Sequence, residues 1–533
     1  MVVCPQPLAA EVGVRVLKRG GNAVDAAVAA AFVQGVIDPA NCGIGGFGQM
    51  NVYMAAKGEQ KVIDFHAKAG AGVKEGMWKG LLLEQPRDRW GYALEGEVNS
   101  KGYTSIAVPG TVMGLSEGLT RFGTITWREA IEPSMDIAEH GYVVAREDAA
   151  EWRTDPKSFA PFLVSGEARR IYTRSGEPHA AGDVISNKDY AGTLRRIAAE
   201  GPETFYRGAL SSAIAEDFER GGGFVTAADL SRYKVRVYTP LISEYRGYAV
   251  ATNDAPGGGI TLLEILNILE GYDLSKYDWR GMGSDVGEYI LILAMAMRAA
   301  EKDRIEFVGD PEFVQVPTES LISKERGSKW RKRIDSGKKI VLPRWRPGEA
   351  PSTTHISVVD PMGNAVSLTH TLGSCSGVIT PGLGFMYNNA MINFNPIPGR
   401  PDSIAPGKSR NTQMAPTIAY DDGSPYIVLG APGGSKILTA ISQTLVNIID
   451  HRMVPFEAVA HPRVFALDTD IIDVSSRIPS SVCDYLEAKG NKVVRLPASY
   501  DDFAMTQAIT IGRKGQDVLG GSDPRRKGVV LST

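Results

Sequence analysis

The chain has 533 residues, of which 43% are hydrophobic, and its 58 basic and 61 acidic residues give a net charge of −3 at pH 7. This near balance leaves no electrostatic footprint for nucleic acid or an anionic membrane, so we expect neither as a partner and favour a small neutral or anionic ligand. The length exceeds that of one ordinary hydrophobic core, which indicates one large domain or two intertwined domains.

The cysteines and the start of the chain bear on the cellular compartment. Cys4, Cys42, Cys375 and Cys483 lie far apart and include no CxxC pair, so we predict neither a disulfide framework nor a zinc site and expect a reducing compartment. The chain begins with an amphipathic pattern instead of a basic segment followed by an apolar one. We therefore expect a cytoplasmic protein.

Metal, cofactor and membrane signals are weak. The seven histidines are scattered, and His355 and His370 flank predicted strands at positions typical of structural residues, so we expect no metal and no cofactor. The densest apolar run, at 23–37, is too short to span a bilayer and carries Asp25. It predicts a buried Ala-rich helix.

The first elements mix helices and strands. Apolar spacing predicts a helix from residue 7 to a glycine stop at 20, followed by the Ala-rich helix. A glycine-rich turn then leads into an alternating strand within 42–55, and the strand at 60–70 is predicted to pair with it. Helix pairs that feed a hairpin indicate α and β layers.

The middle of the chain is predicted to be mostly helical from about 109 to 309. Between 323 and 352 the sequence becomes dense in Lys and Arg, with prolines near its end, which indicates a solvated basic linker. Four predicted strands follow within 353–432, and a helix follows them at 435–452. We therefore expect a new sheet to begin after the linker, with Thr353 at its edge.

Thr353 stands where a nucleophile could be created. A threonine hydroxyl needs a nearby base, and cutting the chain before Thr353 would supply one, because an α-amine has an unperturbed pKa of roughly 7.7–8.0. A linker that ends at Ser352 suits a cleavage junction. The alternative is that Thr353 and Thr354 are β-branched residues that only begin a strand.

A second feature is the stretch "LGAPGGSKI" at 429–437. It predicts a strand, a Pro-Gly-Gly turn and a helix start, and such a turn presents the backbone N–H groups of Gly433, Gly434 and Ser435 toward one point. This is typical of an oxyanion hole or a carboxylate site. The alternative is a tight strand-to-helix connection without a ligand.

The chain resembles the γ-glutamyltranspeptidase family of N-terminal-nucleophile hydrolases. The motifs that carry the resemblance run in order along the whole chain: "GGNAVDAAVAAA" (20–31), "GIGGFG" (43–48), "VPGTVMGL" (108–115), "PGGGITLLEILNILE" (256–270), "DRIEFVGDPEF" (303–313), "TTHISVVDPMGNAVSLTHTL" (353–372), "YNNAMINF" (387–394), "APGGSKI" (431–437) and "GSDPRRKG" (521–528). Several of these strings are weak singly, but their order is highly specific.

The resemblance implies an α+β fold, a four-layer αββα sandwich formed jointly by two subunits from one precursor. Autocatalytic cleavage between Ser352 and Thr353 would give a large subunit, 1–352, and a small subunit, 353–533, as an αβ unit or a dimer of such units. Thr353 matches the nucleophile, and Thr371 matches a second threonine that hydrogen-bonds it across a hairpin. Gly433 and Gly434 match the oxyanion donors.

The residues that hold a glutamyl group in the family differ here. The family arginine that faces the substrate α-carboxylate is His66, and the acidic residue that binds the α-ammonium is Asn393. A neutral Asn cannot pair with a buried ammonium. Four further family positions are also changed, to Gly373, Ala390, Thr412 and Gln413.

We interpret this pattern as retained chemistry with a changed substrate. Arg410 stands where the family lacks an arginine, so it or His66 is predicted to bind the carboxylate of a smaller acid amide, as in amidohydrolases of small acids such as oxamate. A solvent-facing Arg410 is the alternative. A true γ-glutamyl hydrolase or transferase, a cephalosporin (glutaryl) acylase and a catalytically silent binding protein stay open as other functions.

Overall fold

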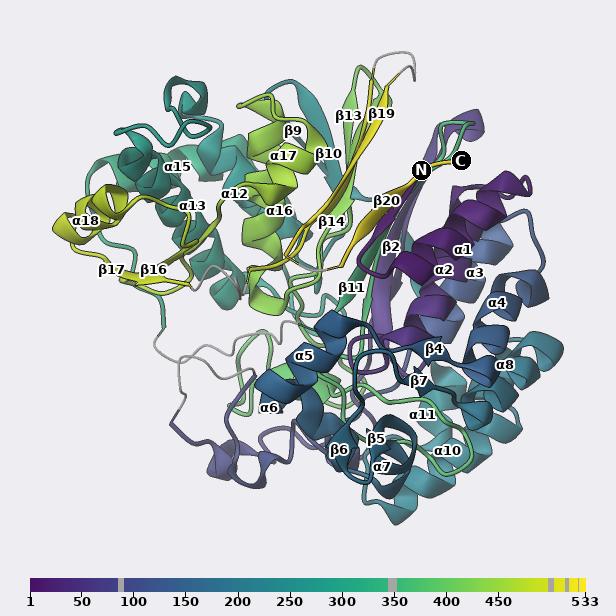
Figure 1. Cartoon of the computed structure of the whole chain (residues 1–533). Coiled ribbons are helices and arrows are strands. Elements are labelled where there is room, and N and C mark those ends of the chain that lie inside the picture. Colours follow the sequence, from purple (N-terminus) through teal and green to yellow (C-terminus); the bar gives the residue numbers. More distant parts are fainter. Residues whose placement is uncertain (85–90, 344–351, 497–502, 513–516, 526) are drawn as a thin grey trace.

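The computed structural model describes residues 1–84, 91–343, 352–496, 503–512, 517–525 and 527–533. Two large β-sheets lie face to face, and helices cover the outer face of each one (Figure 1). The prediction of α and β layers is confirmed. No helix within the described residues is both long and apolar enough to cross a bilayer.

The first sheet has seven strands in the order β20-β1-β11-β12-β2-β3-β8, all antiparallel to their neighbours. β11 and β12 are buried along their whole lengths because one face of the sheet meets helices and the other meets the second sheet. The strands are β1 (Val2–Cys4), β2 (Phe47–Met54), β3 (Glu59–Phe65), β8 (Arg236–Tyr238), β11 (Thr354–Val359), β12 (Ala365–Thr371) and β20 (Val529–Leu531).

The second sheet has six strands in the order β19-β18-β14-β13-β10-β9. Small and branched apolar side chains from both sheets form the layer between them, including Val3, Val359, Ile418 and Ile509. The strands are β9 (Leu241–Tyr245), β10 (Tyr248–Thr252), β13 (Thr417–Asp421), β14 (Ser424–Gly430), β18 (Gln507–Ile511) and β19 (Val518–Ser522). A smaller sheet joins β15 (Val464–Phe465), β16 (Ile471–Val474) and β17 (Lys492–Arg495).

The first sheet is covered by α1 (Pro7–Lys18), α2 (Ala23–Ile37) and α3 (Thr111–Phe122), with α4 (Trp127–His140) and α8 (Lys188–Glu200) outside them. α2 is buried almost all round, which its small alanines permit, and Asn22 and Asp25 form a capping box at its start. Further helices on this side are α5 (Arg146–Thr154), α6 (Pro156–Phe159), α7 (Gly166–Tyr172), α9 (Glu203–Tyr206), α10 (Ala209–Arg220) and α11 (Ala227–Arg232).

The second sheet is covered by α12 (Gly259–Leu269), α13 (Val286–Phe307), α16 (Ile437–Ile449) and α17 (Pro455–Ala460), with α14 (Thr318–Leu321), α15 (Lys324–Asp335) and α18 (Ser480–Ala488) beyond them. α12 and α16 are buried on nearly every side. Their apolar character is therefore that of central helices and not of amphipathic ones.

The prediction of a solvated linker from 323 is wrong for its first part, because 324–335 forms α15. Trp330 is buried, and its Nε1 donates a hydrogen bond of 2.8 Å to Asp303 on α13. Arg326 binds the same carboxylate through an ion pair of 2.5 Å. One buried tryptophan and one ion pair thus hold a helix whose composition indicated a linker; 344–351 lie outside the described residues.

Both sheets mix strands from the two sides of Thr353. β11 and β12 lie between β1 and β2 in the first sheet, and β13 and β14 follow β10 in the second. The expectation of a new sheet after Ser352 is therefore wrong. The later strands complete sheets that the earlier strands have begun, because β11 pairs with β1, β12 with β2 and β13 with β10.

Candidate functional site

Three predicted site residues lie in one row across the first sheet, together with Phe47. Thr354 pairs with His370, Thr371 with Phe47, and Gly48 with Phe65. Continuing each register by one residue places Thr353 opposite Thr371 and His66 opposite Phe47. Directly opposed residues share a face of a sheet, so the order along the row is Thr353, Thr371, Phe47, His66.

The two threonines are in contact. The Thr353 hydroxyl donates a hydrogen bond of 3.1 Å to Thr371 Oγ1, which also accepts a bond of 2.8 Å from the Gly373 N–H. Thr353 is 9% exposed and has a φ of 144°, a conformation that β-branched residues rarely adopt and that costs about 1–3 kcal/mol. Backbone strain is therefore stored at the junction with Ser352.

The Pro-Gly-Gly turn connects β14 to the helical start of α16. Gly433 and Gly434 have φ values of 137° and 56°, which favour glycine. A Cβ on Gly433 would lie 2.3 Å from the Cβ and 2.4 Å from the Cα of Ala504. The turn is also tied to that segment by a bond of 3.0 Å from the Met505 N–H to the Pro432 carbonyl. The local fold thus demands glycine where the oxyanion site is predicted.

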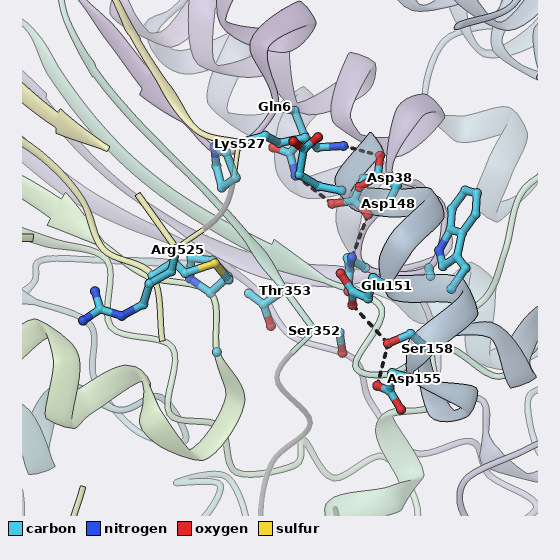
Figure 2. A pocket seen from close by; sticks show the side chains of 18 of the residues that line it. Gln6, Asp38, Asp148, Glu151, Asp155, Ser158, Ser352, Thr353, Arg525 and Lys527 are labelled. Atoms are coloured by element: carbon cyan, nitrogen blue, oxygen red, sulfur yellow. Dashed lines mark hydrogen bonds and ion pairs between the residues drawn. The ribbon is translucent and has the colours of Figure 1, made fainter. Parts of the chain in front are cut away.

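Ser352, Thr353 and Gly433 line the same cavity, which has a volume of about 980 Å³ (Figure 2). The nucleophile candidate and one oxyanion candidate therefore face one cavity that is large enough for a substrate. Gly434 is buried beside it and does not line the cavity.

The walls of the cavity carry opposite charges on its two sides. Acidic side chains from α5, from Asp155 between α5 and α6, and from Asp38 after α2 gather on one side, and Arg525 lies on the other (Figure 2). Lys527 forms an ion pair with Asp148, and Ser158 bonds both Glu151 and Asp155. Sequence reasoning missed this wall because a short charged helix is typical of any solvated surface.

His66 and Arg410 both lie against the ring of Phe47. The rings of His66 and Phe47 are 6.0 Å apart, and the Arg410 guanidinium lies 4.9 Å from the Phe47 ring centre, within cation–π range. His66 is 4% and Arg410 3% exposed, so the alternative of a solvent-facing Arg410 is wrong. The two candidate carboxylate-binding residues thus lie against the same Phe47 ring, and His66 is three strands away from Thr353.

Asp64 holds the ring of His66. His66 Nδ1 lies 2.7 Å from Asp64 Oδ1, while His66 Nε2 has no hydrogen-bond partner among the described residues. Burial raises the pKa of Asp64, but the charge and hydrogen bonds of His66 and the charge of Arg236 outweigh it and lower that pKa overall. An ionised Asp64 favours a proton on Nδ1 and leaves Nε2 as a hydrogen-bond acceptor.

None of the predicted substrate residues lines the cavity, His66 and Arg410 included, and Asn393, Thr412 and Gln413 are buried as well. Asn393 ends a short 3-10 turn (Ala390–Asn393) and is 8% exposed. The Thr412 N–H donates to the Pro256 carbonyl at 3.0 Å, and its Oγ1 accepts from the Met414 N–H at 3.2 Å. Gln413 is 3% exposed. The structure thus groups His66 with Arg410, whereas Thr412 and Gln413 lie beside the turn before α12.

His355 and His370 are structural, as their positions predicted. His370 Nε2 donates to Gln34 Oε1 at 2.8 Å, and His355 bonds Thr369 and Ser357 at 2.8 and 3.1 Å. Burial, with a smaller effect of His370, lowers the pKa of His355 to about 3, and burial lowers the pKa of His370 to about 3. Both rings are therefore neutral at pH 7.

These two histidines predict an acid-sensitive fold. Between pH 6.5 and about pH 3 these histidines are protonated in the unfolded chain but neutral in the folded chain. The free energy of unfolding therefore has its full value above pH 6.5 and falls as the pH drops through this window. Within this window each histidine is expected to lower the free energy of unfolding by about 1.4 kcal/mol per pH unit. Melting temperatures between pH 7.5 and 4.5 measure the slope, and His370→Gln should make it shallower; an unchanged slope would contradict the assignment.

Comparisons with known proteins identify the family of the chain. The family model of gamma-glutamyltranspeptidase matches residues 9–533. The chain is 38% identical to an acylase ACY 1 proenzyme of Pseudomonas sp. (strain V22), covering 93% of this chain and 88% of the relative. It is 35% identical to the glutathione hydrolase proenzyme of Escherichia coli (strain K12), covering 98% and 90%.

Solved structures give the same result. A cephalosporin acylase from Bacillus halodurans has a TM-score of 0.87 and 26% identity, covering all of this chain and 95% of the other. A Helicobacter pylori gamma-glutamyltranspeptidase chain has a TM-score of 0.55 and 34% identity, covering 62% and 90%. The fold is that of N-terminal-nucleophile hydrolases of this group, and the protein is an enzyme of the amide-hydrolysing class. The chain belongs to the gamma-glutamyltranspeptidase family.

Proposed function

We propose that the chain is a precursor that cuts itself before Thr353 and then hydrolyses the amide of a small carboxylate-containing substrate through an acyl-enzyme. The observation that carries this proposal is the strained Thr353, hydrogen-bonded to Thr371 and facing the same cavity as Gly433. That relatives of this family are named proenzymes supports it.

Maturation would begin with attack of the Thr353 hydroxyl oxygen on the carbonyl carbon of Ser352. The C–N bond breaks, the nitrogen keeps its electron pair and takes the hydroxyl proton, and an ester joins Ser352 to Thr353 Oγ1. Water then hydrolyses the ester and leaves a carboxylate on Ser352 and an α-amine on Thr353. Relief of the strain at Thr353 favours the first step.

Catalysis would use the new amine as the base. Its unperturbed pKa of roughly 7.7–8.0 makes it a competent proton acceptor near neutral pH. The Thr353 oxygen attacks the substrate carbonyl, and we assign the N–H groups of Gly433 and Gly434 to the oxyanion. The α-amine of Thr353 passes the proton to the substrate nitrogen, and the substrate amine leaves. Water then hydrolyses the acyl-enzyme.

Cleavage would give a large subunit of residues 1–352 and a small subunit of residues 353–533 that stay together. Each large sheet contains strands from both segments, so the αββα sandwich would be a joint product of the two subunits. Separation would expose the unpaired edges of buried strands.

We assign the substrate carboxylate to Arg410, with His66 as its neighbour. A guanidinium stacked on Phe47 keeps a fixed plane, which suits a carboxylate better than a mobile cation does. The names acylase and glutathione hydrolase among relatives leave glutaryl and γ-glutamyl amides as second candidates. Release of amine from γ-glutamyl, oxamyl and glutaryl amides by processed protein distinguishes them, and turnover of none would favour a silent binding protein.

Arg410→Ala is expected to raise the KM for an acidic amide about 10-fold or more, because a charge-assisted hydrogen bond contributes roughly 1.5–3 kcal/mol. The KM for the matching amide without the carboxylate should change little, which separates loss of recognition from general damage. Processing to two bands checks that the variant folds. Equal KM values of variant and wild type for the acidic amide would refute the role of Arg410.

A further inference from the structure

Arg463 is a fully buried arginine between α17 and β15, at 0% exposure. Its guanidinium donates to the Ala504 carbonyl, to the Val459 carbonyl at 2.8 Å and to Thr506 Oγ1 at 2.7 Å, and it pairs with Asp523 at 2.8 Å. Burying a cation costs several kcal/mol unless its donors are satisfied. The bonds to Ala504 and Thr506 tie Arg463 firmly to the segment 504–506.

The same segment forms the support of the predicted oxyanion turn. Ala504 occupies the space where a side chain on Gly433 would lie, and the Met505 N–H binds the Pro432 carbonyl at 3.0 Å. Gly433 therefore packs against Ala504, and the carbonyl of Ala504 accepts a hydrogen bond from Arg463. The chain of contacts from Arg463 to Gly433 contains one intermediate residue and only buried groups.

We propose that Arg463 is a positioning residue that, through Ala504, fixes the Gly433 N–H where the oxyanion of the acyl transfer forms. This inference rests on the proposed function. An oxyanion donor acts in the transition state and not in substrate binding, so a displaced donor lowers kcat and leaves KM nearly unchanged. Lysine cannot replace the arginine, because only the planar guanidinium fork reaches several acceptors in fixed directions.

The test measures kcat and KM on glutaryl and γ-glutamyl p-nitroanilides, per mole of processed small subunit. Arg463→Lys is expected to lower kcat about 10-fold or more, with KM within about two-fold. Ala504→Gly, which removes the methyl group nearest Gly433 and keeps Arg463, is expected to lower kcat in the same direction. This second variant decides the matter if Arg463→Lys does not fold.

Arg298→Lys is the matched control. Arg298 is 3% exposed and, like Arg463, binds backbone carbonyls, those of Asp468 at 2.8 Å and Ile471 at 3.2 Å, but it does not line the cavity. The Arg298→Lys variant should have a lower stability and an unchanged kcat. Unchanged kcat in both Arg463→Lys and Ala504→Gly would overturn the inference, whereas hydrolysis by Thr353→Ala would overturn the proposed function itself.

Discussion

Thr353→Ala is expected to remain a single 533-residue chain on denaturing electrophoresis, whereas the wild type should give two bands that correspond to residues 1–352 and 353–533. Without the hydroxyl there is no attack on the Ser352 carbonyl, no ester and no new α-amine. Amide hydrolysis should fall by about 10⁴-fold or more, the scale on which removal of a nucleophile acts. The fold should persist, because Thr353 donates only one side-chain bond, to Thr371.

Two controls sharpen this result. Thr353→Ser keeps a hydroxyl at the same place and should still produce two bands, more slowly or less completely. Thr354→Val changes the adjacent threonine, whose hydroxyl bonds Gln6 in the interior, and should process normally. An active wild type that stays in one piece, or a cleaved Thr353→Ala, would rule out Thr353 as the nucleophile.

Gly433→Ala is expected to lower kcat by about 10²- to 10³-fold, the usual cost of a lost oxyanion donor. The new methyl group would meet the Cβ and Cα of Ala504 at 2.3 and 2.4 Å, and the backbone would also be strained at a φ of 137°. Backbone atoms cannot swing aside, so the turn must move instead. Steady-state kinetics on processed protein measure the effect.

Gly423→Ala is the control for backbone strain alone. Gly423 has a φ of 75° in the turn between β13 and β14, and a Cβ there meets nothing within 4 Å. It should lose about 1 kcal/mol of stability and keep full activity. Similar kcat values for Gly433→Ala and wild type would place the oxyanion site elsewhere.

Local features of the fold were predictable from the sequence, and long-range ones were not. α2 was predicted from its Ala-rich apolar run at 23–37, and the structure has it at Ala23–Ile37, with Asn22 as its cap. The hairpin of β2 and β3 also follows from two adjacent alternating segments. The insertion of β11 between β1 and β12 did not follow, because pairing across more than 350 residues leaves no local signal.

The candidate site divides in the same way. The contact between Thr353 and Thr371 was predictable because both flank one hairpin, and the Pro-Gly-Gly string marked its turn. The support of that turn by Ala504 was not predictable, since it depends on a packing contact between residues 71 positions apart in the chain (504 − 433). The burial of Arg410 against Phe47 could not be predicted either, because it too depends on a contact between distant segments.

The interleaving of both sheets has a consequence for the life of the proposed mature enzyme. Folding of the precursor is a reaction within one molecule, but after the cut the unfolded state consists of two separate molecules. Recovery then becomes bimolecular, depends on concentration, and competes with aggregation of exposed strand edges. The lifetime of the processed enzyme is therefore set by its rate of unfolding and not by its ability to refold.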